Sequence, residues 1–231
     1  MNTKYYTNAV IQALMAALVM MALLVSSFFL IEPTVGQAVT SGPFTIRQTI
    51  TDEISFLVNA ANVVATGSIN GITGGTGNGS TTVVVRTNSN TGYHMSIAFF
   101  NNGSTNAMRG DVTASDSIRD YPSTGGEPAY NFSTASSAAV FGYTVSAADT
   151  SDIDPSFLNN GTACNTGSSH TVNQCWMEPT TSNFKIIDRA TSATAGATST
   201  VQFRIHVPNN PSPALVADVY TATATLTALN Q

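Results

Sequence analysis

Charged side chains are scarce in this chain of 231 residues. Only 9% of the residues are Asp, Glu, Lys or Arg, against about 25% in a typical soluble domain. The eight Lys and Arg residues do not cluster, and the formal net charge is −5. A nucleic-acid-binding surface needs concentrated positive charge, so we expect no nucleic-acid partner. Uncharged hydroxyl and amide side chains hydrate a surface without repelling neighbouring subunits, which suits fibres and coats.

Recognisable catalytic motifs are missing as well. The sequence contains neither H-E-x-x-H nor G-x-S-x-G, which mark zinc proteases and serine hydrolases. Of the three histidines, His94 and His206 fall at polar positions of expected strands, where a solvated side chain is the ordinary interpretation. A Ser-His-Asp triad need not be local in sequence, but no serine stands out as a nucleophile. We therefore expect a protein that is not an enzyme and has no cofactor.

One long apolar run lies near the N-terminus, and residues 9–31 contain only three polar side chains. The run is followed by V-G-Q-A, whose small residues Gly36 and Ala38 fit a signal-peptidase site. This pattern predicts a signal peptide over residues 1–38, cleaved after Ala38. A helix of the same run would span roughly 34 Å, enough to cross a bilayer. An uncleaved transmembrane anchor is therefore the alternative, and both place residues 39–231 at the cell surface or outside the cell.

Cysteine is nearly absent, and its two copies lie close together. Cys164 and Cys175 flank a stretch of ten residues. An exported chain meets an oxidising compartment, which favours a disulfide between them. A redox or metal-binding pair is the alternative, but there is no C-x-x-C and only His170 lies between them.

The dominant pattern after residue 38 is alternation of apolar and polar side chains. The clearest example is 201–207, with Val201, Phe203 and Ile205 on one face, a period typical of strands. The C-terminal stretch 218–231 alternates Tyr, Ala and Leu with Thr, so we expect its apolar face to pack inside. No amphipathic helix of ten residues is visible. The pattern predicts an all-β fold, an antiparallel β-sandwich of the immunoglobulin or pilin-like type, as a single domain over 39–231. Further strands are expected at 44–50, 54–58, 67–72, 81–87, 93–100, 139–145 and 184–187.

Two connections between these strands are unusually long, at 100–137 and 147–182. Loops of such length are uncommon unless they are functional or disordered. They leave opposite ends of the strand expected at 139–145, so we expect them at opposite poles, without a shared site. Aromatic side chains on exposed loops can stack on sugars. The binding-loop candidates are Tyr121, Tyr130 and Trp176.

The second connection also carries a group of carboxylates. Asp149, Asp152 and Asp154 lie within six residues, and Ca²⁺ prefers such hard oxygen ligands. The spacing is not that of an EF-hand, and a solvated turn with a helix N-cap is the alternative. The sequence also has four N-x-S/T sequons, all in expected loops, at Asn78, Asn102, Asn131 and Asn160.

Three stretches carry a resemblance to known proteins. They are F-T-I-R-Q-T-I-T-D-E-I-S-F-L-V from Phe44, the segment 68–97 with Gly74-Gly75 and a T-N…T-G-Y turn, and the Thr-rich end 208–231. They resemble an uncharacterised group of secreted β-proteins from candidate-phylum bacteria. A looser similarity is to spore-coat-U-like and pilin-like sandwiches. The resemblance implies export and a sandwich fold, and no catalytic residues.

These observations predict a non-enzymatic structural protein of the cell surface, a fibre, pilus or coat subunit. Residues 44–50 would then be either a donor strand for the next subunit or an ordinary first strand of their own sandwich. The alternative function is a surface adhesin or carbohydrate-binding module. The expected partners are thus copies of the chain itself or surface glycans.

Overall fold

The computed structural model describes residues 3–30, 43–101, 105–123 and 125–231. It divides the chain into two units, Met1–Thr49 and Ile50–Gln231. The first contains one helix, α1 (Thr3–Leu30), rich in the helix formers Ala, Leu and Met. The stretch Thr7–Phe28 is long and apolar enough to cross a membrane. This confirms an N-terminal apolar helix of the kind that signal peptides and anchors share; the expected cleavage after Ala38 lies outside the described residues.

Residues 44–50 form no strand in this structure. No regular secondary structure is present from residue 43 to residue 53. The apolar side chains Phe44, Ile46 and Ile50 are 80%, 83% and 81% exposed. The strand expected at 44–50 is therefore not found. Alternation selects an extended strand only where a partner edge supplies hydrogen bonds and cover.

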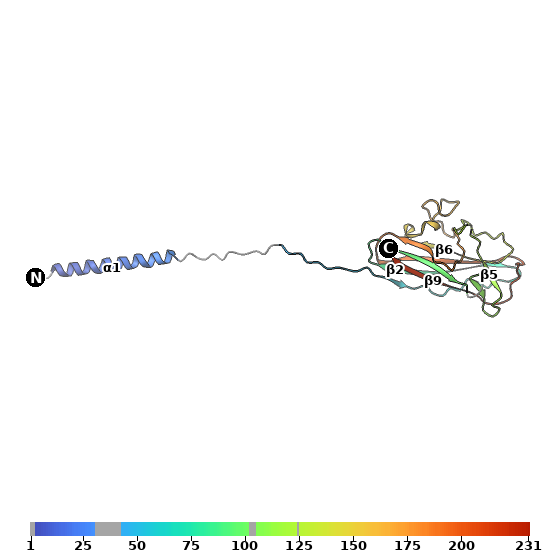
Figure 1. Cartoon of the computed structure of the whole chain (residues 1–231), viewed down its shortest axis with the longest axis horizontal. Helices are drawn as coiled ribbons and strands as arrows, with labels where there is room; N and C mark the ends of the chain where they lie inside the picture. Colours follow the sequence, from blue (N-terminus) through green and yellow to red (C-terminus); the bar gives the residue numbers. More distant parts are fainter. Residues whose placement is uncertain (1–2, 31–42, 102–104, 124) are drawn as a thin grey trace. The chain divides into compact units, whose positions relative to one another are not determined.

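The second unit is mostly β and contains one largely antiparallel sheet (Figure 1). Its order is β1-β2-β8-β6-β5-β4-β9-β3-β7, and only the β5–β6 pair is parallel. The all-β prediction is confirmed at this level. The strands are β1 (Ile54–Val58), β2 (Gly75–Thr87), β3 (Tyr93–Phe100), β4 (Met108–Gly110), β5 (Ser117–Asp120), β6 (Val140–Ala147), β7 (Phe184–Arg189), β8 (Ala193–Val207) and β9 (Tyr220–Asn230).

Strand β2 begins earlier than the sequence pattern predicts. The glycine-rich stretch 75–80, which precedes the strand expected at 81–87, pairs in register with β8. Residues 67–72, expected as a strand, form only a bridge at Asn70. The glycines are needed because residues 63–69 lie directly over them. A Cβ on Gly79 would fall 2.4 Å from Val63 Cγ1. Asn78 therefore lies in a strand, so the expectation that every sequon falls in a loop is wrong for this one.

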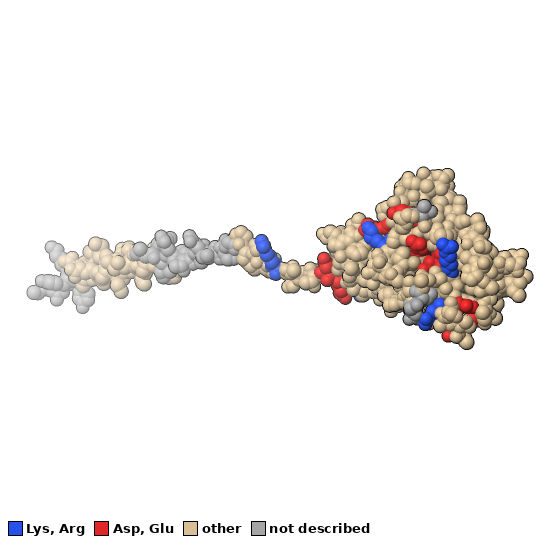
Figure 2. All heavy atoms as spheres, turned by 45° about the vertical axis from the view of Figure 1, so that its right-hand side comes forward, with Lys and Arg blue, Asp and Glu red and all other residues tan. Residues whose placement is uncertain are grey.

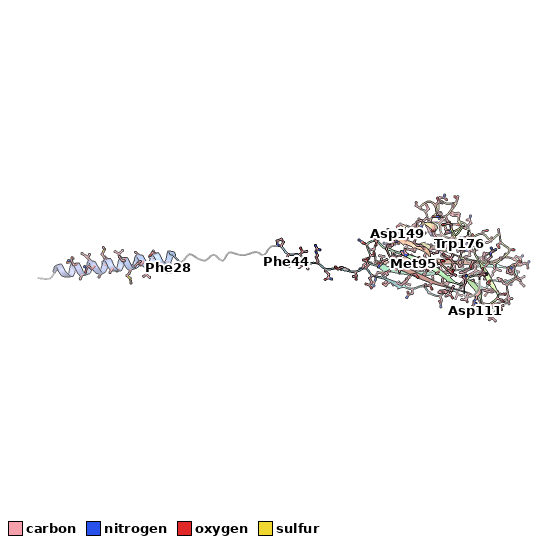
Figure 3. The ribbon with its side chains drawn as sticks, viewed as in Figure 1. Phe28, Phe44, Met95, Asp111, Asp149 and Trp176 are labelled. Carbon is pink, nitrogen blue, oxygen red and sulfur yellow. A yellow bond between two sulfur atoms is a disulfide. The ribbon has the colours of Figure 1, made fainter. Side chains whose placement is uncertain are left out.

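The core joins strands that are not neighbours in the sheet. The ring centroids of Phe99 in β3 and Phe141 in β6 lie 5.9 Å apart, and those of Phe99 and Tyr143 lie 5.4 Å apart. Met95, which Figure 3 labels, is fully buried in the same cluster. One apolar cluster thus contains side chains from β2, β3, β6, β7 and β8.

Both long connections contain short elements of structure. The stretch 100–137 holds β4 and β5, and 147–182 holds two 3₁₀ helices, η1 (Thr150–Asp152) and η2 (Pro155–Phe157). Cys164 and Cys175 form a disulfide, which confirms the expected pairing and fits an exported domain.

Candidate functional site

Two of the three aromatic binding-loop candidates lie in one cluster and are buried, because Tyr121 and Trp176 are each 1% exposed. The third, Tyr130, is half-buried and packs against the main core. Phe132 joins Tyr121 and Trp176, stacked on Tyr121 at 4.7 Å between ring centroids and edge-on to Trp176 at 5.0 Å. Their polar atoms are satisfied within the loops, because Tyr121 Oη donates to a carbonyl at 2.8 Å and Trp176 Nε1 donates to another at 2.9 Å.

The expectation that the two long connections lie at opposite poles is wrong. Ala129 and Trp176 exchange two backbone hydrogen bonds of 2.8 Å. The second connection doubles back along β6, where Met177 and Tyr143 also exchange two backbone bonds. Chain order showed where each connection leaves β6, but not that the second returns alongside it.

A cation completes this aromatic cluster. The Arg204 guanidinium carbon lies 4.3 Å from the Trp176 ring centroid and 5.4 Å from that of Phe132. Arg204 Nε donates to Asn78 Oδ1 at 2.8 Å. Burial lowers the Arg204 pKa. These rings therefore cover one another and a cation, and they present no open stacking face to a sugar.

The carboxylates of the second connection are turned to separate partners. Asp149 Oδ1 accepts from Ser151 N at 3.0 Å and so caps η1; these bonds from Ser151 hold the Asp149 pKa below its usual value. Asp152 Oδ2 lies 2.6 Å from Arg189 Nη1, and burial raises the Asp152 pKa despite this pairing.

Asp154 follows the same pattern. Its Oδ1 accepts from Ser156 N at 3.0 Å and caps η2, while Oδ2 lies 3.1 Å from Lys185 Nζ. The three carboxylates considered for Ca²⁺ are thus used as two caps and two ion pairs. Within residues 3–30, 43–101, 105–123 and 125–231, no three His, Cys, Asp or Glu side chains are grouped to hold a metal ion.

A polar hollow of about 380 Å³ lies beside β5. Arg119 is its charged lining residue, and Leu215 and Pro213 supply part of its apolar wall. On the face that Figure 2 shows, Lys and Arg side chains lie among Asp and Glu and form no basic field. The remaining lining residues are Asn106, Ser117, Ser136, Ser137, Ala138, Ala139 and Ser212.

Asp120, beside Arg119 in the chain, has an unusual ionisation. Its Oδ1 accepts from Ala107 N at 2.9 Å. Burial raises the pKa of Asp120 to about 6, the Ala107 bond opposes this rise, and the charge of Glu178 adds to it. The carboxyl group therefore changes its charge between about pH 5 and pH 7.

The last strand, β9, is paired along one edge only. Figure 1 draws β9 in red with β3 in green beside it. β3 faces β9 from Asn230 to Thr223, and β4 continues that register without a break, with Met108 opposite Ala222. β3 and β4 thus follow one another along β9.

Two hydrogen bonds place β3 and β4 on the same edge. The backbone N–H of Phe99 donates to Thr180 O at 2.8 Å, on the side of β3 that faces away from β9. The backbone groups of the next residue, Phe100, therefore face Thr223 in β9. In the segment after β4, Asp111 N donates to Val219 O at 2.8 Å. Backbone groups of successive residues point to alternate edges, so Val219 and Thr223 point to the same one.

The N–H and C=O groups of the even-numbered residues of β9 therefore face the other edge. In the strand order β9 stands between β4 and β3, but these two pair with successive parts of the same edge. The other edge has no strand partner in the described part of the structure. The apolar face of β9 is correspondingly incomplete, because Leu226 and Ala228 are half-buried and Ala224 is exposed. The expectation that this face packs inside is confirmed only in part. The residues at this open edge are Tyr220, Ala222, Ala224, Leu226, Ala228 and Asn230.

The chain just before β1 is held in an extended path by one side chain. Asn88 Oδ1 accepts from Glu53 N at 2.6 Å, and Asn88 Nδ2 donates to Thr51 O at 3.0 Å. Thr87 Oγ1 donates to Glu53 O at 2.8 Å. These bonds extend the β1–β2 pairing to the residues just before β1 and oppose a turn at residues 51–53.

Comparison of the chain with protein-family models, curated proteins and solved structures gives no match. The function is therefore inferred from the geometry above. The aromatic rings and the carboxylates predicted as site residues serve the fold. The open edge of β9 was not predicted, although the absence of any charge or proline between Tyr220 and Asn230 was the available signal.

Proposed function

We propose that this chain is a non-enzymatic structural protein of the cell surface or extracellular space, a subunit of a fibre, pilus or coat. The single observation that carries the proposal is the segment 44–50, which has the alternation of a strand and forms no strand in the structure. A strand that lacks a partner in one copy is suited to pairing with another copy.

Three further features support this assignment. The apolar helix α1 fits export or anchoring, and the disulfide fits an oxidising compartment. The weakly charged, hydroxyl-rich composition limits repulsion between packed copies. The resemblance to secreted β-proteins and to pilin-like sandwiches agrees with the same role.

The sheet in this proposal is folded into a two-layered sandwich. The contacts of Phe99 with Phe141 and Tyr143 support it, since they join β3 to β6 across the core rather than along the sheet. Two sheet layers facing each other across a shared apolar core are the architecture of sandwiches.

The test is the assembly state of purified residues 39–231, followed by size-exclusion chromatography and negative-stain electron microscopy. A subunit is expected to form filaments or a ladder of oligomers. A monomer at high concentration would count against the subunit role. Mass spectrometry of the exported chain measures whether its first residue is Val39, as cleavage after Ala38 requires.

A second candidate function is a glycan-binding adhesin, and the polar hollow lined by Arg119 favours it. Serine hydroxyls and a guanidinium suit the hydroxyl groups of a sugar. A glycan array compares the wild type with Arg119→Ala. Binding that the substitution removes supports an adhesin, and equal signals from both proteins would refute a site at this hollow.

A further inference from the structure

The open edge of β9 is long and regular, and β1 lies near β9 without being hydrogen-bonded to it. Its pairing with β3 and β4 runs without a bulge over all 11 residues of β9. Natural proteins usually protect a free edge with a charge, a proline, a bulge or a covering loop. Between Tyr220 and Asn230 there is no charged residue and no proline. Such an edge is ready to accept another strand.

The other ends of the sheet are less suited to this role. The outer side of β7 is covered, because Asp154 N donates to Ile186 O and Ile153 bridges Ile187. β1 has a free outer side, but it is only five residues long and is paired with β2 through a register shift.

The end of β9 lies beside the end of β2, since Thr87 Oγ1 donates to Asn230 Oδ1 at 2.7 Å. The inner neighbour of β2 is β8, and its outer neighbour is β1. The open edge of β9 and the free side of β1 thus belong to the same region of the domain. A strand added to β9 would also cover the half-buried side chains of that region, such as Leu226 and Ile54.

The occupant that matches this edge is present in the sequence. Residues 44–50 alternate Phe44, Ile46, Gln48 and Ile50 with Thr45, Arg47 and Thr49. The first side is large and mostly apolar, whereas β9 offers the small side chains of Ala222, Ala224 and Ala228. Large side chains packed against small ones fill a layer well.

We infer that residues 44–50 of a second copy add to the open edge of β9, and that copies of the chain join head to tail in this way. This inference rests on the proposed structural role. Because each copy has one such segment and one such edge, the contact is heterologous and extends into a filament or closes into a ring. Insertion of the segment beside β9 of its own chain is opposed by Asn88. Its hydrogen bonds to Thr51 and Glu53 keep the chain extended there and oppose a turn back toward β9.

The experiment is disulfide cross-linking between two differently tagged full-length chains expressed together. One carries the donor substitution Thr45→Cys or Thr49→Cys, and the other carries Thr225→Cys on the exposed face of β9. Directly opposed residues of paired strands have Cβ atoms about 4.5–5.5 Å apart, close enough for a disulfide. The matched control is Thr198→Cys, an equally exposed threonine in β8, whose two edges are filled by β2 and β6. Both native cysteines are already paired.

The inference requires a mixed-tag dimer with Thr225→Cys from at least one donor position, about tenfold more abundant than with Thr198→Cys. Oligomers without this dimer would overturn the assignment to β9 and leave the subunit role standing. If neither oligomers nor dimers form, both proposals fail. A chain that carries both cysteines and closes a cross-link on itself would show that the segment completes its own sheet, which also overturns the inference.

A second measurement does not depend on cysteine chemistry. Ile46→Asp places a charge on the apolar side of the donor segment and is expected to raise the concentration needed for half-assembly about tenfold or more. Arg47→Gln, next to it on the polar side, is the control and is expected to leave assembly unchanged. Equal behaviour of the two variants would contradict strand addition.

Discussion

Replacing Phe132 by alanine tests whether the two long connections pack against one another. The ring is stacked on Tyr121 at 4.7 Å and 20°, and it meets Trp176 edge-on at 5.0 Å and 79°. Each aromatic pair contributes about 0.5–1.5 kcal/mol beyond burial. A fully buried Phe→Ala change costs about 3–5 kcal/mol, and Phe132 is half-buried. We therefore expect Phe132→Ala to lower the free energy of unfolding by about 2–3 kcal/mol.

The assay is urea unfolding of residues 39–231, followed by tryptophan fluorescence. The chain has a single tryptophan, so the signal reports this cluster alone. Trp176 is 1% exposed, and its emission is expected to shift to longer wavelength when the Phe132 ring is removed. For a domain of this size the loss corresponds to a decrease in Tm of roughly 4–12 °C.

The control is Phe100→Ala, because Phe100 is 53% exposed and lies outside the cluster. Its expected loss is below about 1 kcal/mol. If Phe132→Ala and Phe100→Ala were equal, and the Trp176 emission did not move, the packing of the two connections would be refuted. The aromatic residues would then be available to a ligand, as the sequence pattern first predicted.

Three other changes test the contacts that hold this domain. Joint replacement Cys164→Ser and Cys175→Ser is expected to lower the free energy of unfolding by about 3 kcal/mol, and a reducing agent should do the same to the wild type; no difference in urea midpoint would contradict this. Arg189→Met leaves the buried Asp152 carboxylate unpaired and should cost about 3–5 kcal/mol, of which a second change, Asp152→Asn, should recover part; a single variant as stable as the wild type would refute the pairing. The folded-state pKa of Asp120, about 6, lies above its ordinary value of 3.8, so the folded state binds this proton more tightly and stability decreases as pH rises from about 4 to 6. Asp120→Asn should remove this decrease, so the variant should gain about 1–2 kcal/mol over the wild type between pH 4.5 and pH 7.5, after allowance for solvent screening. The measurement is the difference in urea midpoint between variant and wild type at each pH. The same difference at both pH values would show that Asp120 does not titrate in this way.

The sequence determined those features that depend on local pattern. An uninterrupted apolar run forms a helix in isolation from the rest of the chain, as α1 does. Two-residue alternation places Val201 and Ile205 on one face of β8, and both are buried. The cysteines at positions 164 and 175 are close in the chain and meet without the help of distant contacts.

Only the tertiary structure decided which segments obtained partners. Alternation predicts a strand equally well at residues 44–50 and in β9, but pairing depends on which edges are near and unoccupied. The first segment forms no strand, whereas β9 has strand partners along a single edge. The pattern cannot distinguish them, because the hydrogen bonds of a strand come from another part of the chain or from another chain.

The same dependence on tertiary contacts explains why the residues predicted as candidate sites are engaged within the domain. Aromatic and acidic side chains in a loop suggest a sugar or a cation, since their chemistry suits both. Tyr121 and Trp176 are instead buried under Phe132 and Arg204, and Asp152 is paired with Arg189. Residue type fixed what these groups are able to bind. The tertiary structure decided that they contact other groups of the same domain.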